Sequence, residues 1–174
     1  SLIELEMNET AVKAVAAMSV FYRNSLSKGR FIIPLKQELE LTEQYLYIQS
    51  LRYMEYVDYE FNLTATFPMD QIDIPKLTLQ PIVENIFVHA RSTEKCHICV
   101  NITEDDANVA ITITDNGTGI PPEKLKELRT SIYSGSVDGR SFGLPNIHHR
   151  IILLYGMNYG LTITSREKEF TAVT

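Results

Sequence analysis

The sequence predicts an α+β fold, a two-layer α/β sandwich in which helices cover one face of a mixed sheet, preceded by an N-terminal helix. Three observations support this fold class. The chain has 174 residues, 44% of them hydrophobic, which suffices for one packed domain with a helical appendage. Stretches with apolar residues three and four apart are interspersed with short stretches of apolar-polar alternation. Successive strands follow one another as hairpins rather than in regular βαβ order.

The first fifty residues predict two helices with a short strand between them. Residues 2 to 26 carry an apolar stripe at helical spacing, and Lys28-Gly29 supplies a basic last turn and a stop. The run 31 to 33 predicts a brief strand, and helical periodicity returns over 35 to 53. The first stripe consists of Leu5, Val12, Val15, Met18, Tyr22 and Leu26. This stripe could belong to the core of the domain or to an intermolecular bundle; its place before the glycine favours the bundle, and hence a homodimer.

The middle of the chain predicts strands around an apolar helix. Residues 57 to 63 alternate as a half-buried strand, and 68 to 74 are interpreted as a connection. Pro75 suits the first turn of a helix, so a helix is expected from Pro75 to Phe87. Residues 96 to 103 and 108 to 114 form two strands joined by an acidic turn, which is typical of a hairpin.

The last third of the chain predicts two helices and a closing pair of strands. A short helix is expected over 123 to 128, followed at 132 to 143 by a polar, glycine-bearing stretch that we expect to be mobile. Gly143 opens a second helix, which Gly156 ends. Strands over 160 to 165 and 169 to 174 complete the fold.

Charge and hydropathy exclude several classes of function. Sixteen basic against twenty-two acidic residues give a net charge of −6, and no Lys/Arg-rich run is present, so we expect no nucleic-acid partner. No apolar run approaches the roughly 20 residues that span a bilayer, and the N-terminus lacks a signal-peptide layout. We therefore expect a soluble domain that does not itself contact the membrane. Because the chain begins with Ser1, we expect it to be a piece of a longer protein.

Two cysteines form a C-x-x-C motif that is weak as a metal or redox signal. Cys96 and Cys99 lie in the alternating run KCHICVNIT, and side chains three apart on a strand point to opposite faces. No second cysteine pair exists to complete a zinc site. We interpret both as ordinary strand cysteines.

The stretch ITDNGTGIPP, residues 113 to 122, places an acid where a strand ends, followed by two glycines. It matches neither a Walker loop nor the dinucleotide fingerprint, whose third glycine position holds Pro122. An ionised carboxylate only accepts hydrogen bonds, so Asp115 would favour an amino-bearing ring such as adenine over guanine. Taken alone, an Asp-Asn-Gly sequence is more often simply a turn. Both readings stay open on this stretch by itself.

Three blocks in order resemble the motifs of the GHKL ATP-binding fold, the Bergerat type. LQPIVENIFVHA (79 to 90), DNGTGI (115 to 120) and FGLPNIHHRIILLYG (142 to 156) are similar to its N, first-glycine and second-glycine boxes. More narrowly, the chain resembles sensor histidine kinases of the LytS type. Residues 18 to 53 are similar to the segment that joins dimerisation helices to the catalytic domain in that group. The resemblance implies that 1 to 28 belong to the dimerisation and phosphotransfer helices and 29 to 174 to the ATP-binding catalytic domain.

The same resemblance implies a role for individual residues, with ATP and Mg²⁺ as cofactors. Asn85 would coordinate Mg²⁺, and Glu84 would orient or deprotonate a neighbouring group, although a structural hydrogen bond is an equal alternative. Asp115 would accept from the adenine amine, and 121 to 142 would form the ATP lid. The remaining nucleotide-binding residues would be His89, Gly117, Gly119, Gly143, Leu144 and Asn146, the second-glycine-box amides facing phosphate as helix N-termini favour.

Departures from the family pattern affect what is expected. Val88 stands where a basic phosphate contact is usual, Ser141 replaces a glycine, and the final hairpin EKEFTAVT lacks its usual glycine, so reduced nucleotide affinity is expected. The usual phosphoacceptor lies in a Pro-His-Phe-Leu run, which none of the four histidines, His89, His97, His148 and His149, matches. We therefore expect the acceptor histidine to lie outside this chain.

The resemblance predicts the catalytic domain of a two-component sensor histidine kinase. It would transfer the γ-phosphoryl of ATP to a histidine outside the fragment and thence to a response regulator, as the cytoplasmic domain of a membrane-anchored bacterial protein. A degenerate GHKL module kept for dimerisation or docking is the main alternative. A GHKL-fold serine kinase or ATPase of another branch is a third.

Overall fold

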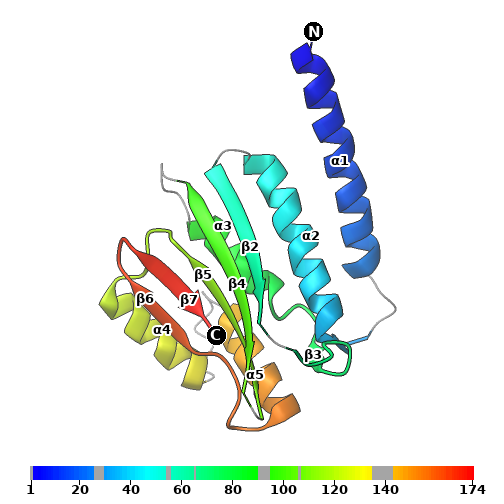
Figure 1. Ribbon diagram of the computed structural model, residues 1–174. Coiled ribbons are helices and arrows are strands. Elements are labelled where there is room, and N and C mark those ends of the chain that lie inside the picture. Colours follow the sequence, from blue (N-terminus) through cyan, green and yellow to red (C-terminus); the bar gives the residue numbers. More distant parts are fainter. Residues whose placement is uncertain are drawn as a thin grey trace.

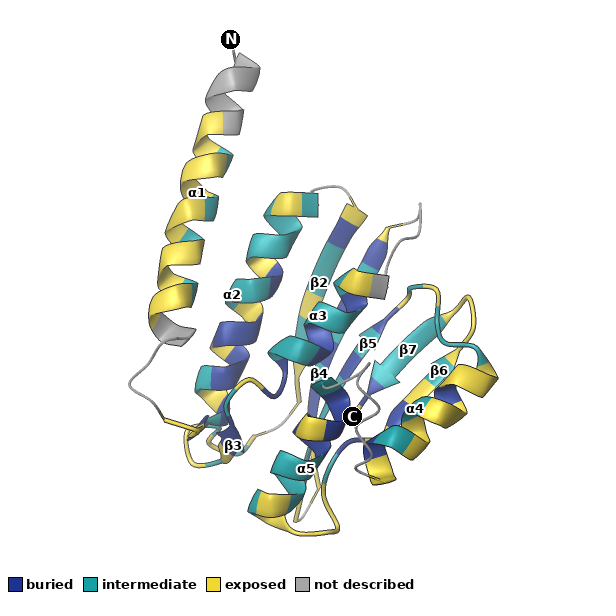
Figure 2. Ribbon diagram, turned by 180° about the vertical axis from the view of Figure 1, so that it is seen from behind, coloured by how far each residue is buried: buried dark blue, intermediate teal, exposed yellow. Residues whose placement is uncertain are grey.

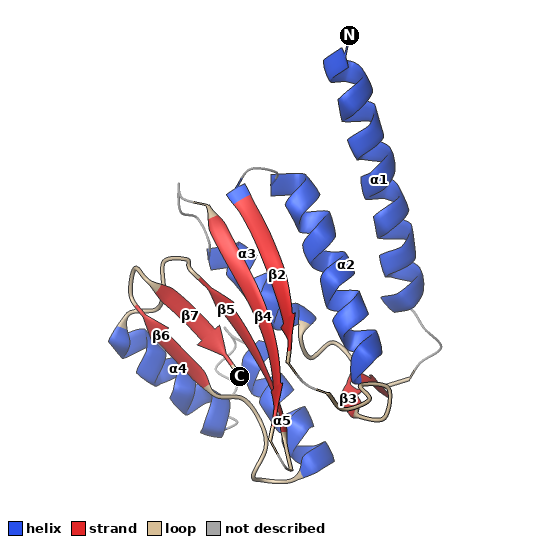
Figure 3. Ribbon diagram, in the orientation of Figure 1, coloured by secondary structure: helices blue, strands red, loops and turns tan. Residues whose placement is uncertain are grey.

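The computed structural model describes residues 2–25, 30–53, 56–64, 66–89, 95–105, 107–134 and 143–174. A five-stranded mixed sheet (Figure 3) has the strand order β2 (Val57–Leu63), β4 (Cys96–Glu104), β5 (Val109–Asp115), β7 (Phe170–Val173) and β6 (Ile163–Arg166). Behind this sheet in Figure 1 lie the helices α3 (Gln80–His89), α4 (Pro122–Ser134) and α5 (Gly143–Tyr155). Helix α2 (Leu35–Tyr53) packs beside β2. Helix α1 (Leu2–Ser25) runs along α2 and projects beyond the sandwich. The predicted two-layer α/β sandwich, with helices on one face and an N-terminal helix in front, is confirmed.

The sheet is built around β4 (Cys96–Glu104), which pairs with β2 (Val57–Leu63) in parallel and with β5 (Val109–Asp115) antiparallel. Alternate residues of β4 are buried and face the helix layer, the dark blue segments in Figure 2: Cys96, Ile98, Val100 and Ile102. Cys99 lies on the opposite face, so the predicted separation of the two cysteines is confirmed, and both are free thiols. Burial raises the pKa of the Cys96 thiol to about 11, and the Asp115 charge acts in the same direction.

The predicted helix start at Pro75 is wrong. Pro75 ends β3 (Asp73–Pro75), which pairs antiparallel with β1 (Ile32–Pro34), whereas α3 begins only at Gln80 and runs to His89. The intervening turn contains Leu77 with φ of 58°, a left-handed conformation that no helix accommodates. The interpretation of 68 to 74 as a plain connection missed β3, because three residues are too short to show an alternation.

The helix expected over 123 to 128 is longer than predicted. Helix α4 runs from Pro122 to Ser134, and its residue Ile132 is 1% exposed, so the polar stretch predicted from 132 begins after this helix. Residues 135–142, which include Ser141 and most of the predicted glycine-bearing stretch, lie outside the described residues. So do Leu26 and the predicted stop Lys28-Gly29.

Helix α2 (Leu35–Tyr53), helix α5 (Gly143–Tyr155) and the closing hairpin of β6 (Ile163–Arg166) and β7 (Phe170–Val173) confirm the remaining elements. Gly156 has φ of 99°, as a residue that ends a helix in the left-handed region requires. In the turn between β6 and β7, Lys168 has φ of 63°. Its backbone N–H donates to Thr118 O at 2.7 Å, which ties this hairpin to the loop after β5.

We expect Lys168→Gly to stabilise the fold, because a non-glycine residue in the left-handed region costs about 1–2 kcal/mol. Glycine also has greater conformational freedom in the unfolded chain, which reduces this stabilisation. A net gain of about 0.5–1 kcal/mol raises the melting midpoint by roughly 1–4 °C in a chain of this size. Calorimetry checks this. Glu167→Gly is the matched control, since its φ is ordinary, and it should destabilise. A lower midpoint for Lys168→Gly would contradict the prediction.

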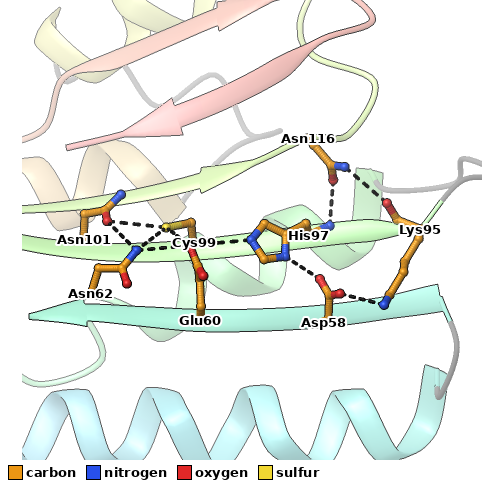
Figure 4. A network of polar contacts seen from close by, with 8 residues as sticks. All are labelled: Asp58, Glu60, Asn62, Lys95, His97, Cys99, Asn101 and Asn116. Atoms are coloured by element: carbon orange, nitrogen blue, oxygen red, sulfur yellow. Dashed lines mark hydrogen bonds and ion pairs between the residues drawn. The ribbon is translucent and has the colours of Figure 1, made fainter.

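The face of the sheet opposite the helices carries a polar network on β2 and β4 (Figure 4). The ring of His97 is hydrogen-bonded through Nδ1 to a carboxylate oxygen of Asp58, whose other oxygen lies 2.6 Å from Lys95 Nζ. His97 Nε2 is 3.7 Å from Glu60 Oε1. The hydrogen bond to Asp58 raises the pKa of His97, and Lys95 and His97 together lower the pKa of Asp58. The network therefore favours charged His97.

We expect the stability that His97 contributes to be pH-dependent. Because its pKa is raised in the fold, the contribution is fully present below the unfolded value near 6.5 and is lost as the pH rises through the folded value. Both side chains are nearly half exposed, so the effect should stay within about 1 kcal/mol. Denaturant unfolding of the wild type and of Asp58→Asn at pH 6 and pH 8.5 checks it. The difference between the two should shrink at the higher pH, and a constant difference would contradict the prediction.

Candidate functional site

A cavity of about 160 Å³ lies between the helix layer and the sheet, at the end of β5. Helices α3, α4 and α5 and strands β5, β6 and β7 all contribute to its wall. Its lining is mostly aliphatic: Ile82, Asn85, Ile86, Ile113, Asp115, Thr118, Gly119, Ile120, Leu128, Leu144, Ile163, Thr171 and Val173. A cavity of about 150 Å³ accepts a benzene ring, so this one has the size for a flat ring and not for a whole nucleotide.

Asp115 is the charged group of this cavity. It is the last residue of β5 and is 8% exposed, on the same face of the sheet as the buried Ile113. One carboxylate oxygen, Oδ1, accepts the backbone N–H of Gly117 at 2.9 Å. This bond is the turn contact that Asp-Asn-Gly chemistry predicts. The turn and a ligand-facing acid are therefore compatible, since a carboxylate offers about four acceptor positions.

The loop after β5 brings bare backbone to the cavity. Gly119 lines it with φ of 60°, and a β-carbon at this residue would lie 2.0 Å from Arg166 O. Two bonds to the closing hairpin fix the loop: Thr118 O accepts from Lys168 N, and Ile120 N donates to Ser165 Oγ at 2.8 Å. Glycine is therefore required at 119 by both conformation and space. Gly117 does not line the cavity, but a β-carbon there would lie 2.6 Å from Asp115 Oδ1.

Helix α3 divides the predicted pair Glu84-Asn85 between two environments. Asn85 lines the cavity, together with Ile82 and Ile86 of the same helix. Glu84 is not in the lining; its Oε1 accepts from Gln80 Nε2 at 2.7 Å, and its charge helps burial to raise the pKa of Tyr45 on α2 to about 12. The backbone of His89 ends α3, whereas its side chain lies outside the described part of the chain.

The first turn of α5 lies beside Asn85. Leu144 is buried and lines the cavity, and a β-carbon built on Gly143 would lie 4.0 Å from Asn85 Nδ2. The N-terminus of this helix, whose first amides have no partner within the helix itself, is therefore next to the predicted metal ligand. Asn146 is exposed and does not line the cavity.

Several lining residues were not predicted from the sequence. Thr171, Val173 and Ile163 belong to the closing hairpin and reach the cavity because β7 pairs with β5, opposite Asp115 and Ile113. Their alternation predicts a strand, but no local signal indicates which strand it joins. Ile82 lies three residues before Asn85 on α3 and four before Ile86, and this helical spacing was a usable signal.

A larger hollow of about 1070 Å³ lies at the C-terminal end of α5. Tyr155, Met157 and Tyr159 are among the residues that line it. It contains none of the predicted site residues, so the smaller cavity at Asp115 is the candidate site.

Comparisons with known proteins identify the family to which the chain belongs. The family model of the histidine kinase-, DNA gyrase B-, and HSP90-like ATPases matches residues 70–174, and a histidine kinase model matches residues 1–57. The chain belongs to the family of histidine kinase-, DNA gyrase B- and HSP90-like ATPases. It therefore carries the ATP-binding fold of that family, and the resemblance inferred from three sequence motifs is confirmed.

Its curated relatives are sensor proteins. The chain is 34% identical to the sensor protein LytS of Bacillus subtilis (strain 168) over 169 residues, 95% of this chain and 28% of LytS. It is 31% identical to an uncharacterized sensor-like histidine kinase of Staphylococcus epidermidis (strain ATCC 12228 / FDA PCI 1200) over 163 residues, 94% of this chain and 31% of that protein. The chain thus spans less than a third of the length of these relatives.

Solved structures share the fold at low identity. The catalytic domain of histidine kinase ThkA matches with a TM-score of 0.58 and 15% identity, covering 82% of this chain and 90% of that one. The histidine kinase AdeS of Acinetobacter baumannii matches with a TM-score of 0.51 and 13% identity, covering 99% of this chain and 79% of that one. In the described part of the chain, no helix has the length and apolar composition needed to cross a bilayer.

Proposed function

We propose that this chain is the ATP-binding catalytic domain of a sensor histidine kinase. It delivers the γ-phosphoryl of ATP to a histidine outside the chain, and a response-regulator aspartate receives it next. The observation that carries the proposal is the buried Asp115 in the lining of a ring-sized cavity that Asn85 and Leu144, in the first turn of α5, also line. Family membership and the sensor-kinase relatives support it.

Asp115 selects the base in this proposal. The amino group of adenine donates to the carboxylate, whereas guanine presents a carbonyl oxygen there and is repelled. The aliphatic walls stack against the ring, and Gly119 lets it lie against backbone. Because Gly117 has no side chain, the Asp115 carboxylate can lie close to its backbone. Gly117 therefore affects base binding indirectly, by allowing this position of Asp115.

The phosphates extend from the base past Asn85 toward α5. Mg²⁺ would be held by the Asn85 amide oxygen together with waters and phosphate oxygens, and when bound it neutralises phosphate charge. The amides at Gly143 and Leu144 face the phosphates at a helix N-terminus, and Asn146 of α5 and His89 at the end of α3 are assigned further contacts to the nucleotide. Glu84 is assigned the orienting role, through its position next to Asn85 on α3. Residues 121 to 142 are assigned to the ATP lid, and 135 to 142 of them lie outside the described residues.

The N-terminal helix supports a homodimer. Its apolar side chains face solvent in the chain as described, since Val12 is 68%, Val15 64% and Tyr22 56% exposed. Among the described side chains of α1, Phe21 packs against the core, with its ring centroid 6.0 Å from that of Tyr45 of α2. The stripe therefore suits an intermolecular bundle, with residues 1 to 28 as part of the dimerisation region and 29 to 174 as the catalytic domain. In the full protein, we place this domain on the cytoplasmic side of a membrane-anchored sensor.

Thermal unfolding with Mg·ATP and with Mg·GTP tests the nucleotide site. A ligand at 100 times its Kd stabilises by about 2.7 kcal/mol, a midpoint shift of roughly 5–10 °C for a chain of this size. Mg·ATP should give such a shift and Mg·GTP should not. Equal shifts would remove Asp115 as the selecting group, and no shift at millimolar Mg·ATP would overturn the proposal.

Phosphoryl transfer needs a longer chain that includes the upstream helix. Incubation with labelled ATP should yield phosphate that is acid-labile and base-stable, as expected for phosphohistidine. The competing candidate, a docking module without kinase activity, is favoured by Val88, which is 63% exposed on α3 where the family has a phosphate-binding cation. Bound Mg·ATP without any labelled histidine would favour the docking module.

A further inference from the structure

We propose that Glu38 of α2 is a positioning residue for the nucleotide site. Its buried carboxylate holds the turn from which α3 begins, so α2 sets the position of Asn85. This inference rests on the proposed ATP-binding function. It concerns a residue outside the cavity lining, since Glu38 lies in the first turn of α2 and does not line the site.

The carboxylate of Glu38 closes the N-terminal end of α3 from a different helix. Glu38 is 1% exposed, and its two oxygens accept the backbone N–H groups of Leu77 at 3.1 Å, Thr78 at 2.7 Å and Leu79 at 3.0 Å. These amides immediately precede α3, and Leu79 O accepts from Ile82 N and Val83 N at 3.1 Å. The amides at a helix start lack partners within the helix and carry a partial positive charge, so a carboxylate is their strongest natural acceptor.

Arg150 of α5 holds the other side of the same turn. Its guanidinium donates to Lys76 O and to Leu77 O, both at 2.7 Å. Burial raises the pKa of Glu38, and the three amides and the Arg150 charge oppose that shift. The backbone N–H groups of the turn are thus bound by a side chain of α2, and its backbone carbonyl groups by a side chain of α5. We call Glu38, residues 76 to 79 and Arg150 the α2–α3–α5 brace.

The conformation of the turn shows why it needs such a brace. Leu77 has φ of 58°, which costs a non-glycine residue free energy and persists only where surrounding contacts enforce it. Helix α3 begins three residues later and presents Ile82, Asn85 and Ile86 to the cavity. A site of this kind requires its groups within about 0.5 Å of their working positions. Loss of the bonds that hold residues 76 to 79 would therefore displace the part of the cavity wall that α3 forms. It would do so under conditions where the domain is still folded.

Glu38→Gln tests the brace, because glutamine keeps the shape but presents an NH₂ group to at least one of the three amides. Two readouts are needed: the Kd for Mg·ATP at a temperature where all variants are folded, and amide hydrogen exchange over residues 80 to 88 without nucleotide. We expect Kd to rise at least tenfold, exchange in α3 to accelerate at least tenfold, and the preference for ATP over GTP to persist because Asp115 is intact. A lower melting midpoint with unchanged Kd and exchange would mean that Glu38 acts only on stability, and would overturn the proposal.

Glu104→Gln is the matched control. Glu104 also accepts two backbone amides, Thr66 N at 2.9 Å and Phe67 N at 3.2 Å, but it lies at the exposed end of β4 and its bonds are to the segment after β2, not to the turn before α3. It should change neither Kd nor exchange in α3. A rise in Kd equal to that of Glu38→Gln would show a nonspecific effect of lost amide contacts and overturn the brace.

Leu77→Gly supplies a rescue. Glycine adopts φ near 60° without strain, so in the Glu38→Gln background it should recover at least threefold of the lost affinity. If Glu38→Gln does not fold, Arg150→Gln is measured instead. The same changes in Kd and exchange are expected for it, and Leu77→Gly should again restore affinity. The brace is overturned if Leu77→Gly restores affinity in neither background. If the wild type binds no Mg·ATP, the proposed function fails. The exchange data then still decide whether Glu38 holds α3, since unchanged exchange overturns the brace whatever the wild type binds.

Discussion

Asp115→Asn is expected to weaken Mg·ATP binding by about 1.5–3 kcal/mol, roughly tenfold to a hundredfold, because it removes a hydrogen bond to a charged group. The asparagine oxygen can still accept from Gly117, so the turn is retained. Its NH₂ group replaces an acceptor oxygen of a side chain that is only 8% exposed, and it would face the amino group of adenine donor to donor. Isothermal titration with Mg·ATP and Mg·GTP measures the change, and the preference for ATP should shrink with it.

Asp105→Asn is the control for this substitution. Asp105 also accepts backbone amides within a turn, from Ala107 at 2.9 Å and Asn108 at 2.8 Å, but it is exposed and lies in the hairpin between β4 and β5. It should leave nucleotide affinity unchanged. An Asp115→Asn chain that binds Mg·ATP as tightly as the wild type would remove Asp115 from the base site.

Gly119→Ala is expected to destabilise the fold by about 2–5 kcal/mol, the sum of left-handed strain and a steric clash in a packed region. The added β-carbon would lie 2.0 Å from Arg166 O, a backbone atom that no side-chain rotation can move away. The loop cannot shift easily, since Thr118 and Ile120 are bonded to the closing hairpin. The melting midpoint should fall by roughly 5–15 °C.

Gly156→Ala is the control that separates the backbone strain at Gly119 from the steric clash with Arg166 O. Gly156 also has a positive φ, 99°, but no atom lies within 4 Å of a β-carbon built there. It should cost only the backbone term of about 1–2 kcal/mol. Equal losses for the two variants would show that the contact with Arg166 has no weight at Gly119. Because the same loop lines the cavity, a folded Gly119→Ala chain should also bind Mg·ATP more weakly.

The parts of the fold that were predictable are those with long, regular patterns. The alternation in β4 identified both its strand character and its buried face, and the helical spacing over 35 to 53 identified α2 to the residue. The start of α3 was not predictable in this way. Pro75 is a good residue for a first helical turn, but a carboxylate 41 residues before Leu79 stabilises a left-handed turn at Leu77 instead. A tertiary contact overrode a local preference.

The residues of the candidate site also fall into those that a local sequence motif predicts and those that only tertiary contacts bring to the cavity. Asp115, Gly119, Asn85 and Leu144 were named from short motifs, and the structure brings these four to one cavity. Glu84 and Asn146, named from the same motifs, lie outside its lining, because only one face of each helix borders the cavity. The hairpin residues Thr171 and Val173 had no motif, since their contribution depends on which strand β7 joins.

By itself, the sequence determined the family, the order of most elements and the acid at the end of β5, because motifs and periodicities are properties of neighbouring residues. Only the tertiary structure decided that β2 lies parallel to β4 and that the closing hairpin of β6 and β7 lines the cavity. It also decided that Glu38 and Arg150 both form hydrogen bonds to the turn before α3. Those features depend on burial and hydrogen bonding between segments that are far apart in the chain. A buried carboxylate must find its donors wherever packing brings them, and no spacing along the sequence records which donors these are.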